Sequence, residues 1–185
     1  MKKVLITGGA GYIGSILARL LLKEGFKVRV MDILMFGGES IVELLNDPNF
    51  EFIKGDVREK KDREKALQGM DMVVNLAAIV GDPACSKQPE LAKETNLEAT
   101  KKMYQEANEF GVERFVFAST CSNYGKSKNP ENYMTEESEL APVSLYAETK
   151  VAAEKYLLSQ PEKNKTKPTC LKICYRIWTL PAYAI

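Results

Sequence analysis

The chain contains no histidine among its 185 residues. This absence excludes catalytic triads built on histidine and metal sites with histidine ligands. The four cysteines form no Cys-x-x-Cys pair, so neither a zinc site nor a thioredoxin-like redox site is expected, and no metal is predicted. No secretory signal is recognisable at the start of the sequence, so we expect reduced thiols and a cytoplasmic protein.

Long hydrophobic runs and one-sided charge are also lacking. No apolar run approaches the roughly 18 residues that a membrane-spanning helix needs, so no membrane association is expected. The 26 basic and 25 acidic residues leave a net charge of +1 without a basic stripe or tail, so nucleic acid is not an expected partner. The remaining composition, 45% hydrophobic and 28% charged, is ordinary for a globular domain with a core of its own.

Short apolar runs alternate with segments of helical periodicity along the chain. The expected strands cover residues 3–7, 27–31, 50–54, 72–76, 114–118 and 169–173. The expected helices cover residues 13–22, 40–45, 61–67, 90–110 and 146–158. This alternation predicts an α/β fold with a doubly wound parallel sheet of Rossmann type and right-handed crossovers. The polar loop over residues 126–142 is long enough to suggest a functional flap.

Three glycines follow the first expected strand. Gly8, Gly11 and Gly14 stand where that strand turns into a helix, in the spacing Gly-x-x-Gly-x-x-Gly rather than the commoner Gly-x-Gly-x-x-Gly. Glycines at this point permit a tight turn and let backbone N–H groups approach a pyrophosphate, which the helix N-terminus stabilises. A glycine turn without a ligand is the alternative.

Acidic residues follow the next two strands. Asp32 ends the second strand, 24 residues beyond Gly8. A carboxylate there can accept hydrogen bonds from a ribose diol and would repel a 2′-phosphate, which favours NAD over NADP as the cofactor. A solvated aspartate at a strand end is the alternative. Asp56 and Val57 follow the third strand at the same sheet edge, where they contact adenine or form a plain turn.

Two further segments complete the pattern. The segment Leu76-Ala77-Ala78 after Asn75 contains small residues that would let a cofactor pass closely, although they also suit tight packing. Tyr146 and Lys150 stand four residues apart, on one face of a predicted helix. Beside a nucleotide-binding turn, this pair suggests a proton-transferring tyrosine next to a nicotinamide.

Four segments together resemble a known family. They are Thr7-Gly-Gly-Ala-Gly-Tyr-Ile-Gly14, Asn75-Leu-Ala-Ala78, Ala118-Ser-Thr-Cys-Ser-Asn-Tyr-Gly125 and Tyr146-Ala-Glu-Thr-Lys150. In this order and spacing they resemble the extended short-chain dehydrogenase/reductase family, and within it most closely the nucleotide-sugar epimerases and dehydratases. The resemblance runs from about residue 2 to residue 172.

The resemblance implies an NAD-dependent epimerase or oxidoreductase that acts on a nucleotide sugar. Tyr146 would be the acid/base for a sugar hydroxyl. A free tyrosine has a pKa near 10, so the positive charge of Lys150, together with that of the oxidised nicotinamide, would lower it. Lys150 would also hold the nicotinamide ribose. Thr120 would hydrogen-bond the substrate oxygen, with Ser119 and Ser122 as less favoured alternatives.

The family also suggests further cofactor contacts. Tyr12 and Ile13 belong to the glycine segment, and Asn96 matches an asparagine that lies near the cofactor. A capping or surface role is the alternative for Asn96. The family's dimers are built from two long helices of each subunit, which match residues 90–110 and 146–158, so a homodimer is expected.

Departures from the family narrow the activity. The sugar dehydratases carry Asp-Glu after the threonine, whereas this chain has Cys121-Ser122, which disfavours loss of water and leaves epimerisation or oxidation/reduction. Val80 stands where galactose epimerases carry a lysine, which argues against a galactose epimerase.

The last residues do not match the family pattern. Family members continue into a C-terminal substrate domain, so we expect a cofactor domain over residues 1–172, an atypical tail over 173–185 and an incomplete sugar site. The tail sequence Ile173-Cys-Tyr-Arg-Ile-Trp-Thr179 can be encoded so that a one-base shift reads Phe-Ala-Thr-Val-Tyr-Gly, the family's usual sequence here. A frameshift in a longer parent is therefore one hypothesis, and an unusual natural tail is the other. Functionally, the alternatives to an enzyme are a cofactor-binding fragment with little turnover and an NAD(P)-sensing regulator.

Overall fold

The computed structural model describes residues 1–125 and 134–173. The predicted tail beyond Ile173 and the first part of the predicted flap lie outside these residues.

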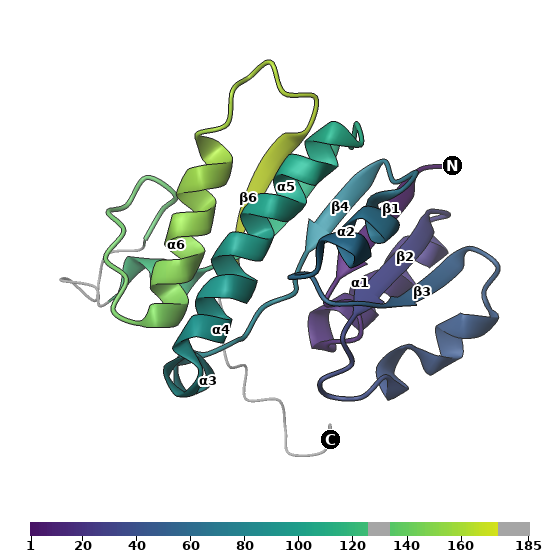
Figure 1. Cartoon of the computed structure of the whole chain (residues 1–185), viewed down its shortest axis with the longest axis horizontal. Helices are drawn as coiled ribbons and strands as arrows, with labels where there is room; N and C mark the ends of the chain where they lie inside the picture. Colours follow the sequence, from purple (N-terminus) through teal and green to yellow (C-terminus); the bar gives the residue numbers. More distant parts are fainter. Residues whose placement is uncertain (126–133, 174–185) are drawn as a thin grey trace.

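A six-stranded sheet forms the centre of the molecule (Figure 1). Its strands run in the order β3-β2-β1-β4-β5-β6, and every neighbouring pair is parallel. The strands are β1 Lys3–Thr7, β2 Lys27–Asp32, β3 Phe50–Lys54, β4 Met72–Asn75, β5 Arg114–Thr120 and β6 Lys167–Ile173. This order is that of the Rossmann-type doubly wound fold, which confirms the predicted fold class.

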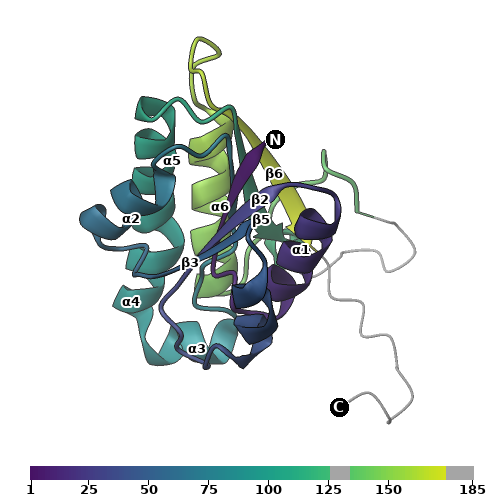
Figure 2. The ribbon, with the colours of Figure 1, turned by 90° about the vertical axis from the view of Figure 1, so that its right-hand side faces the viewer.

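Helices cover both faces of the sheet (Figure 2). On one face lie α1 Tyr12–Lys23 and the 3₁₀-helix η1 Glu39–Asn46. On the other face lie α2 Lys60–Leu67, α3 Asp82–Lys87, α4 Pro89–Lys93, the π-helical segment η2 Glu94–Glu98, α5 Ala99–Glu109 and α6 Leu145–Leu158. The short 3₁₀-helix η3 Cys121–Tyr124 follows β5.

The two faces of the sheet carry separate hydrophobic clusters. In β1 the side chain of Leu5 packs into the cluster under α2, α5 and α6, whereas Val4 and Ile6 pack into the cluster under α1 and η1. This alternation along a strand that is buried on both sides explains why β1 reads as a continuous apolar run. Packing in these clusters holds the strands in place, and the candidate site lies at their carboxyl ends.

Three of the differences from the predicted elements concern the walls of the site. The helix expected over residues 90–110 begins at Pro89 and contains the π-helical segment η2, which places Asn96 in the interior. The short helix α3 was not predicted, although Gly81, Asp82 and Pro83 form a plausible helix start. Strand β5 continues to Thr120, two residues beyond its predicted end, and so brings that hydroxyl to the sheet edge. Within residues 1–125 and 134–173, none of the helices has the length and apolarity that a bilayer crossing requires.

Candidate active site

A cavity of about 410 Å³ opens at the edge where the strands end. It lies beside β1 and β4, where the strand order reverses direction, and this is the place where open α/β sheets bind ligands. The predicted cofactor and catalytic residues that line it are Gly8, Gly11, Tyr12, Ile13, Gly14, Asp32, Asp56, Val57, Leu76, Ala77, Ala78, Thr120, Tyr146 and Lys150. The fold therefore brings the two halves of the predicted site into one space.

The glycine turn is shaped by close backbone contacts. Gly8 has a φ of +68°, and a Cβ added there would lie 2.8 Å from the Cα of Ala77. A Cβ on Gly14 would lie 2.5 Å from the Cα of Gly9. These two positions therefore require glycine for packing, whatever else the turn does.

Helix α1 begins inside this turn and offers a place for an anion. Its N-cap is Gly11, which has no side chain to cap the helix, and the first turn contains no acidic residue. The first N–H groups of a helix have no partners within it and carry a partial positive charge. Because Gly11, Tyr12 and Ile13 also line the cavity, this end fits the pyrophosphate of a dinucleotide.

Asp32 is fixed in place by two backbone groups. Its Oδ2 accepts a hydrogen bond from the Ala10 N–H at 3.0 Å, and its Oδ1 accepts one from the Leu34 N–H at 2.8 Å. A carboxylate has about four lone-pair sites, so two such bonds leave acceptors for a ribose diol. Asp32 is therefore more than a solvated aspartate at a strand end, because its carboxylate connects the glycine turn to the end of β2.

Asp56 is paired with Arg58 at the same edge. The Arg58 Nη2 lies 2.6 Å from the Asp56 Oδ2, and hydrogen bonds from Arg58 hold the pKa of Asp56 below its usual range despite partial burial. Both residues line the cavity, and Arg58 also approaches Glu94 at 3.5 Å. Asp56 is therefore ionised, and its carboxylate is already paired with a guanidinium. The sequence analysis did not predict this ion pair.

The end of β4 is supported from behind. The Thr7 hydroxyl donates to the Asn75 Oδ1 at 2.7 Å, and Asn75 in turn donates to Thr100 at 3.1 Å. Asn96 accepts from the Ile79 N–H at 2.8 Å and donates to the Ile79 carbonyl at 3.0 Å. It is completely buried, so the suggested surface role is wrong. Among the described residues it supports the cavity wall from behind and does not itself line the cavity.

Lys150 lies buried beside Tyr146 on the cavity wall. Its Nζ donates to the Ala118 carbonyl at 2.8 Å and lies 4.6 Å from the ring centre of Phe117 and 6.0 Å from that of Tyr146. Burial lowers the pKa of Lys150 to about 8. The ammonium group is therefore still mostly protonated at neutral pH, with its charge close to the tyrosine.

Three candidate hydroxyls lie at the end of β5 and just beyond it, and that of Thr120 is best placed for chemistry. Thr120 and Ser119 both line the cavity, and the Thr120 Oγ1 accepts a hydrogen bond from the Ser122 N–H at 3.2 Å. The Ser119 hydroxyl donates to Glu154 at 2.7 Å. Ser122 is exposed and lies outside the cavity lining. The geometry thus favours the residue that the sequence favoured.

A buried polar network lies directly behind Thr120. Glu154 accepts from Ser119 and, at 3.2 Å, from Asn123, and its Oε1 lies 3.4 Å from the Nζ of Lys172. Lys172 also donates to the hydroxyl of Tyr124 at 3.0 Å. Glu154 stands four residues beyond Lys150 on α6, so one helix face carries the tyrosine, the lysine and the carboxylate that joins the helix to the end of β5.

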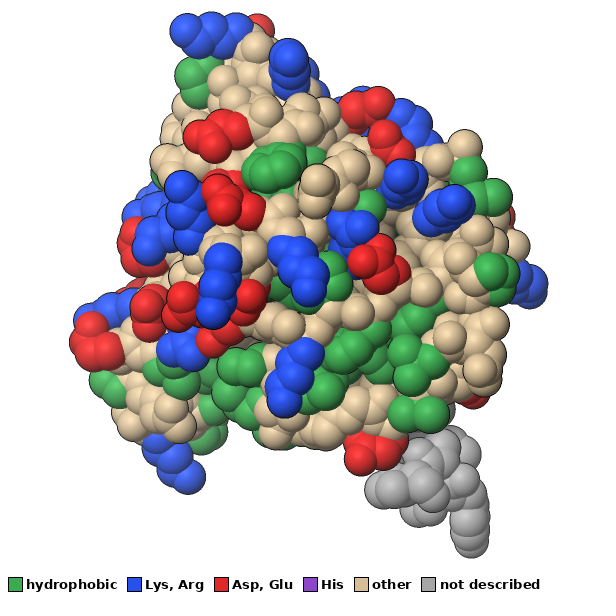
Figure 3. Space-filling model, turned by 45° about the vertical axis from the view of Figure 1, so that its right-hand side comes forward, with side chains coloured by type: hydrophobic (Ala, Val, Ile, Leu, Met, Phe, Trp, Pro, Cys, Tyr) green, Lys and Arg blue, Asp and Glu red, His purple; other side chains and the backbone are tan. Residues whose placement is uncertain are grey.

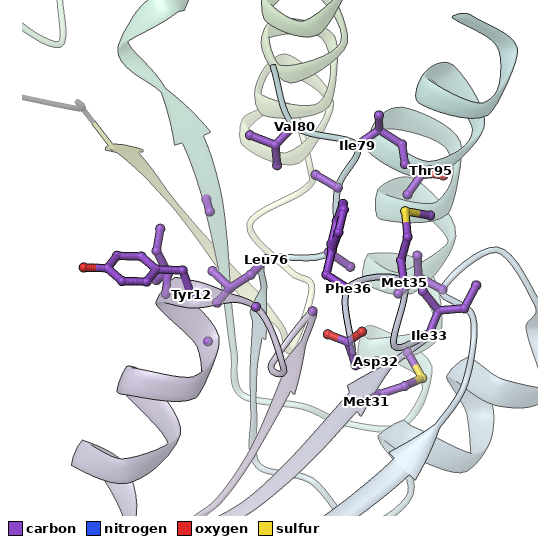
Figure 4. Close-up of a pocket in the computed structure, with 18 of the residues that line it drawn as sticks. Tyr12, Met31, Asp32, Ile33, Met35, Phe36, Leu76, Ile79, Val80 and Thr95 are labelled. Atoms are coloured by element: carbon purple, nitrogen blue, oxygen red, sulfur yellow. The ribbon is translucent and has the colours of Figure 1, made fainter. Parts of the chain in front are cut away.

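The sequence prediction missed an apolar part of the cavity wall (Figure 4). Ile33, Met35 and Phe36 come from the turn after β2, and Ile79 comes from the segment after β4. The signal was present, because an apolar run directly after Asp32 is unusual for a surface turn. Val80, which departs from the family pattern, also lines this wall.

Residues 4–176 match the profile of the family described as "NAD dependent epimerase/dehydratase family". Among curated proteins, the UDP-glucose 4-epimerase of Lactobacillus helveticus is 34% identical over 172 residues, which cover 92% of this chain and 50% of the relative. The match confirms the resemblance inferred from the four segments.

Comparison with solved structures leads to the same group of proteins. The UDP-N-acetylglucosamine 4-epimerase from Methanobrevibacter ruminantium M1, in complex with UDP-N-acetylmuramic acid, superimposes with a TM-score of 0.83 at 30% identity and covers 92% of this chain and 54% of its own. The UDP-glucuronic acid 4-epimerase from Bacillus cereus, in complex with UDP-glucuronic acid and NAD, gives a TM-score of 0.83 at 28% identity, with 92% and 55% covered. This chain therefore spans about half the length of the relatives that it matches.

Proposed function

Because the chain belongs to the NAD-dependent epimerase/dehydratase family, we propose that it takes part in the epimerisation or oxidation/reduction of a nucleotide sugar. One observation carries the proposal: Thr120, Tyr146 and Lys150 line the same cavity as the glycine turn. The cofactor of the family is NAD, and the described residues fit it through the helix N-terminus at Gly11 and the carboxylate of Asp32.

NAD held by these residues would supply hydride transfer from and to the sugar carbon. The residues of this chain handle the proton. Tyr146 takes the proton of the sugar hydroxyl as the carbon is oxidised to a ketone, and gives it back when the ketone is reduced. The hydroxyl of Thr120 holds the reacting oxygen in place.

Lys150 makes the tyrosine a usable base. Its ammonium group lies 6.0 Å from the ring centre of Tyr146, close enough for its charge to favour the phenolate. Its Nζ donates to the carbonyl of Ala118 at the cavity wall, and the same group would hold a ribose hydroxyl of the cofactor. The low pKa of Lys150, which follows from burial, means that its charge weakens above about pH 8.

Calorimetry with NAD and NADP tests the cofactor assignment. NAD binding that is clearly tighter than NADP binding is the expected result, and preference for NADP would contradict the role of Asp32. Turnover is then assayed over UDP-, dTDP-, GDP- and CDP-sugars, with Tyr146→Phe as the inactive control. Activity that survives in Tyr146→Phe would remove the tyrosine from the mechanism.

A second candidate function is cofactor binding with little turnover. The chain matches its relatives over about half of their length, and the matched part contains the predicted cofactor residues that line the cavity. Intact NAD binding without turnover on any of the sugars supports this alternative. The NAD(P)-sensing regulator is less favoured, because Tyr146 and Lys150 are both present in the cavity.

Three further assignments belong to the proposal. A homodimer through the helices over residues 90–110 and 146–158 is tested by sedimentation at several concentrations. The cytoplasm is the proposed compartment, and the free thiols of Cys85, Cys121 and Cys170 are in keeping with it. The cofactor domain is assigned to residues 1–172, and sequencing of the coding DNA tests whether the frame shifts near Ile173.

A further inference from the structure

The turn after β2 presents apolar side chains to solvent at the mouth of the cavity. Phe36 is 94% exposed, Met35 55% and Ile33 42%, and all three line the cavity. Three large apolar side chains in one surface turn are costly to leave in water. Figure 3 shows hydrophobic side chains gathered in the lower part of the face it presents, toward the edge where the strands end.

This turn is held in place although its side chains are exposed. At its start, Asp32 accepts from the N–H of Ala10, and at its end Ser40 donates to the carbonyl of Ala10 at 2.6 Å. Within it, the Gly37 N–H donates to the Leu34 carbonyl at 3.2 Å, and Leu34 has a φ of +62°. Both ends of the turn are thus tied to a single residue of the glycine turn, so the backbone that carries Phe36 is held at the mouth of the cavity.

An apolar wall faces the turn across the cavity. Ile79 and Val80 lie opposite Phe36 in Figure 4, and Val80 is 54% exposed. Asn96 holds the backbone of Ile79 on both its N–H and its carbonyl, so this wall is supported as well. The space between the two walls is continuous with Asp32 and the glycine turn.

We propose that Phe36, with Met35 beside it, covers the adenosine half of NAD and controls how long this chain retains the cofactor. The turn follows β2, whose end carries the carboxylate suited to the adenosine ribose, whereas Thr120, Tyr146 and Lys150 lie across β1 and β4 on the other half of the sheet. An aromatic face can stack on a base irrespective of its identity, and the contact removes the exposed ring from water.

Retention matters for the proposed function, on which this inference rests. In an epimerisation the same cofactor molecule accepts and returns the hydride, so a reduced cofactor that leaves before the second transfer ends the cycle. An apolar cover over adenosine slows departure without touching the nicotinamide. Affinity differences among variants of one site arise mostly in the dissociation rate, so the effect is expected there.

The test compares two exposed phenylalanines. Phe36→Ala is expected to weaken NAD binding about tenfold in calorimetry, which corresponds to about 1.4 kcal/mol, and to weaken ADP-ribose binding by the same factor. Displacement of bound NADH by excess ADP-ribose, followed by fluorescence, is expected to run about tenfold faster. Phe110→Ala is the matched control, because Phe110 is 44% exposed at the end of α5 and lies outside the cavity lining; it is expected to leave both measurements unchanged.

The outcomes distinguish the proposed cofactor site from the proposed role of Phe36 as its cover. Wild-type affinity and release rate in Phe36→Ala would overturn the cover while the cofactor site stands. A wild-type chain that binds no NAD would overturn the cofactor site and the cover together. Met35→Ala provides a second variant should Phe36→Ala not fold, with a smaller loss of NAD and ADP-ribose affinity expected and an unchanged affinity contradicting the proposal.

Discussion

The two ends of the cavity are built in different ways. At the cofactor end, the glycine turn and the turn after β2 place backbone groups, one aspartate and exposed apolar side chains around open space. At the chemistry end, Lys150 and Glu154 are buried and their charged groups are held by specific partners. The cofactor end depends on the absence of side-chain bulk, so substitutions there should be harmful for steric reasons. The chemistry end depends on the compensation of buried charge, so substitutions there should be harmful for electrostatic reasons.

The largest effect is expected at Gly8. Gly8→Ala adds a Cβ that would lie 2.8 Å from the backbone of Ala77, at a φ of +68°. The conformational cost and the clash together should lower the free energy of unfolding by about 3 kcal/mol, measured by urea denaturation. Gly25→Ala is the matched control, because Gly25 has a φ of +82° but nothing within 4 Å of its added Cβ. Equal losses in the two variants would show that the close contact is not what requires glycine.

Lys150 should give the chemistry end a distinctive pH dependence. The pKa of Lys150 is lowered from 10.5 to about 8 in the folded chain, because burial disfavours its charge. As the pH rises from 8 to 10.5, the folded chain loses this proton before the unfolded chain does, so the unfolded state binds more protons and stability increases.

Lys150→Met removes this contribution. The stability of the wild type relative to Lys150→Met should therefore rise by up to roughly 3 kcal/mol between pH 8 and 10.5. Subtracting the variant cancels other groups that titrate in this range, such as Cys170, whose pKa is raised to about 12 by burial and by the nearby Glu154. If the difference in unfolding free energy between the two proteins does not change from pH 8 to 10.5, burial does not lower the pKa of Lys150.

Glu154→Gln tests whether charge matters behind Thr120. The amide keeps the shape and one oxygen acceptor for Ser119 but leaves Lys172 without its anionic neighbour. A loss of about 2 kcal/mol in unfolding free energy is expected, since hydrogen bonds to charged groups are the stronger ones. Lys172→Met and the double variant complete a cycle, and a coupling energy near zero would show that the two charges act independently.

The smallest effect is expected from Asp32→Asn. One oxygen acceptor remains, so either the Ala10 or the Leu34 N–H keeps its partner while the other faces the new amide NH2, and the negative charge at the proposed ribose site is lost. We expect NAD affinity to fall about tenfold and the preference over NADP to shrink, both measured by calorimetry. Asp47→Asn is the control, because Asp47 accepts from the Asn49 N–H in a similar local turn away from the cavity. A variant that discriminates against NADP as well as the wild type does would assign selectivity to another group.

The cofactor end could be predicted from the sequence largely because its signals are local. Glycines between a strand and a helix, and an acidic residue after the next strand, are read directly from spacing, and the fold gathers them at one edge. The pair of Tyr146 and Lys150 was also found from spacing, and Thr120 from the family resemblance. The sequence does not reveal that Glu154 meets Ser119, because that contact joins residues 35 apart through tertiary packing.

The misses have physical causes too. The prediction of Asn96 near the cofactor did not include its contact with the backbone of Ile79, because the π-helical segment that contains Asn96 leaves no periodic signal in the sequence. Phe36 was not predicted, because an apolar residue after a strand is compatible with any irregular turn. Only the structure shows that a cavity lies beside it.

The double attachment of Ala10 has a consequence for how the free chain fluctuates. One carboxylate, that of Asp32, accepts the amide protons of both Ala10 and Leu34, while Ser40 holds the carbonyl of Ala10. The two N–H groups donate to the same carboxylate, so hydrogen exchange should report one common opening free energy for both. The site proposed for adenosine would then be a single cooperative unit before any nucleotide arrives, and binding would have little backbone ordering left to supply.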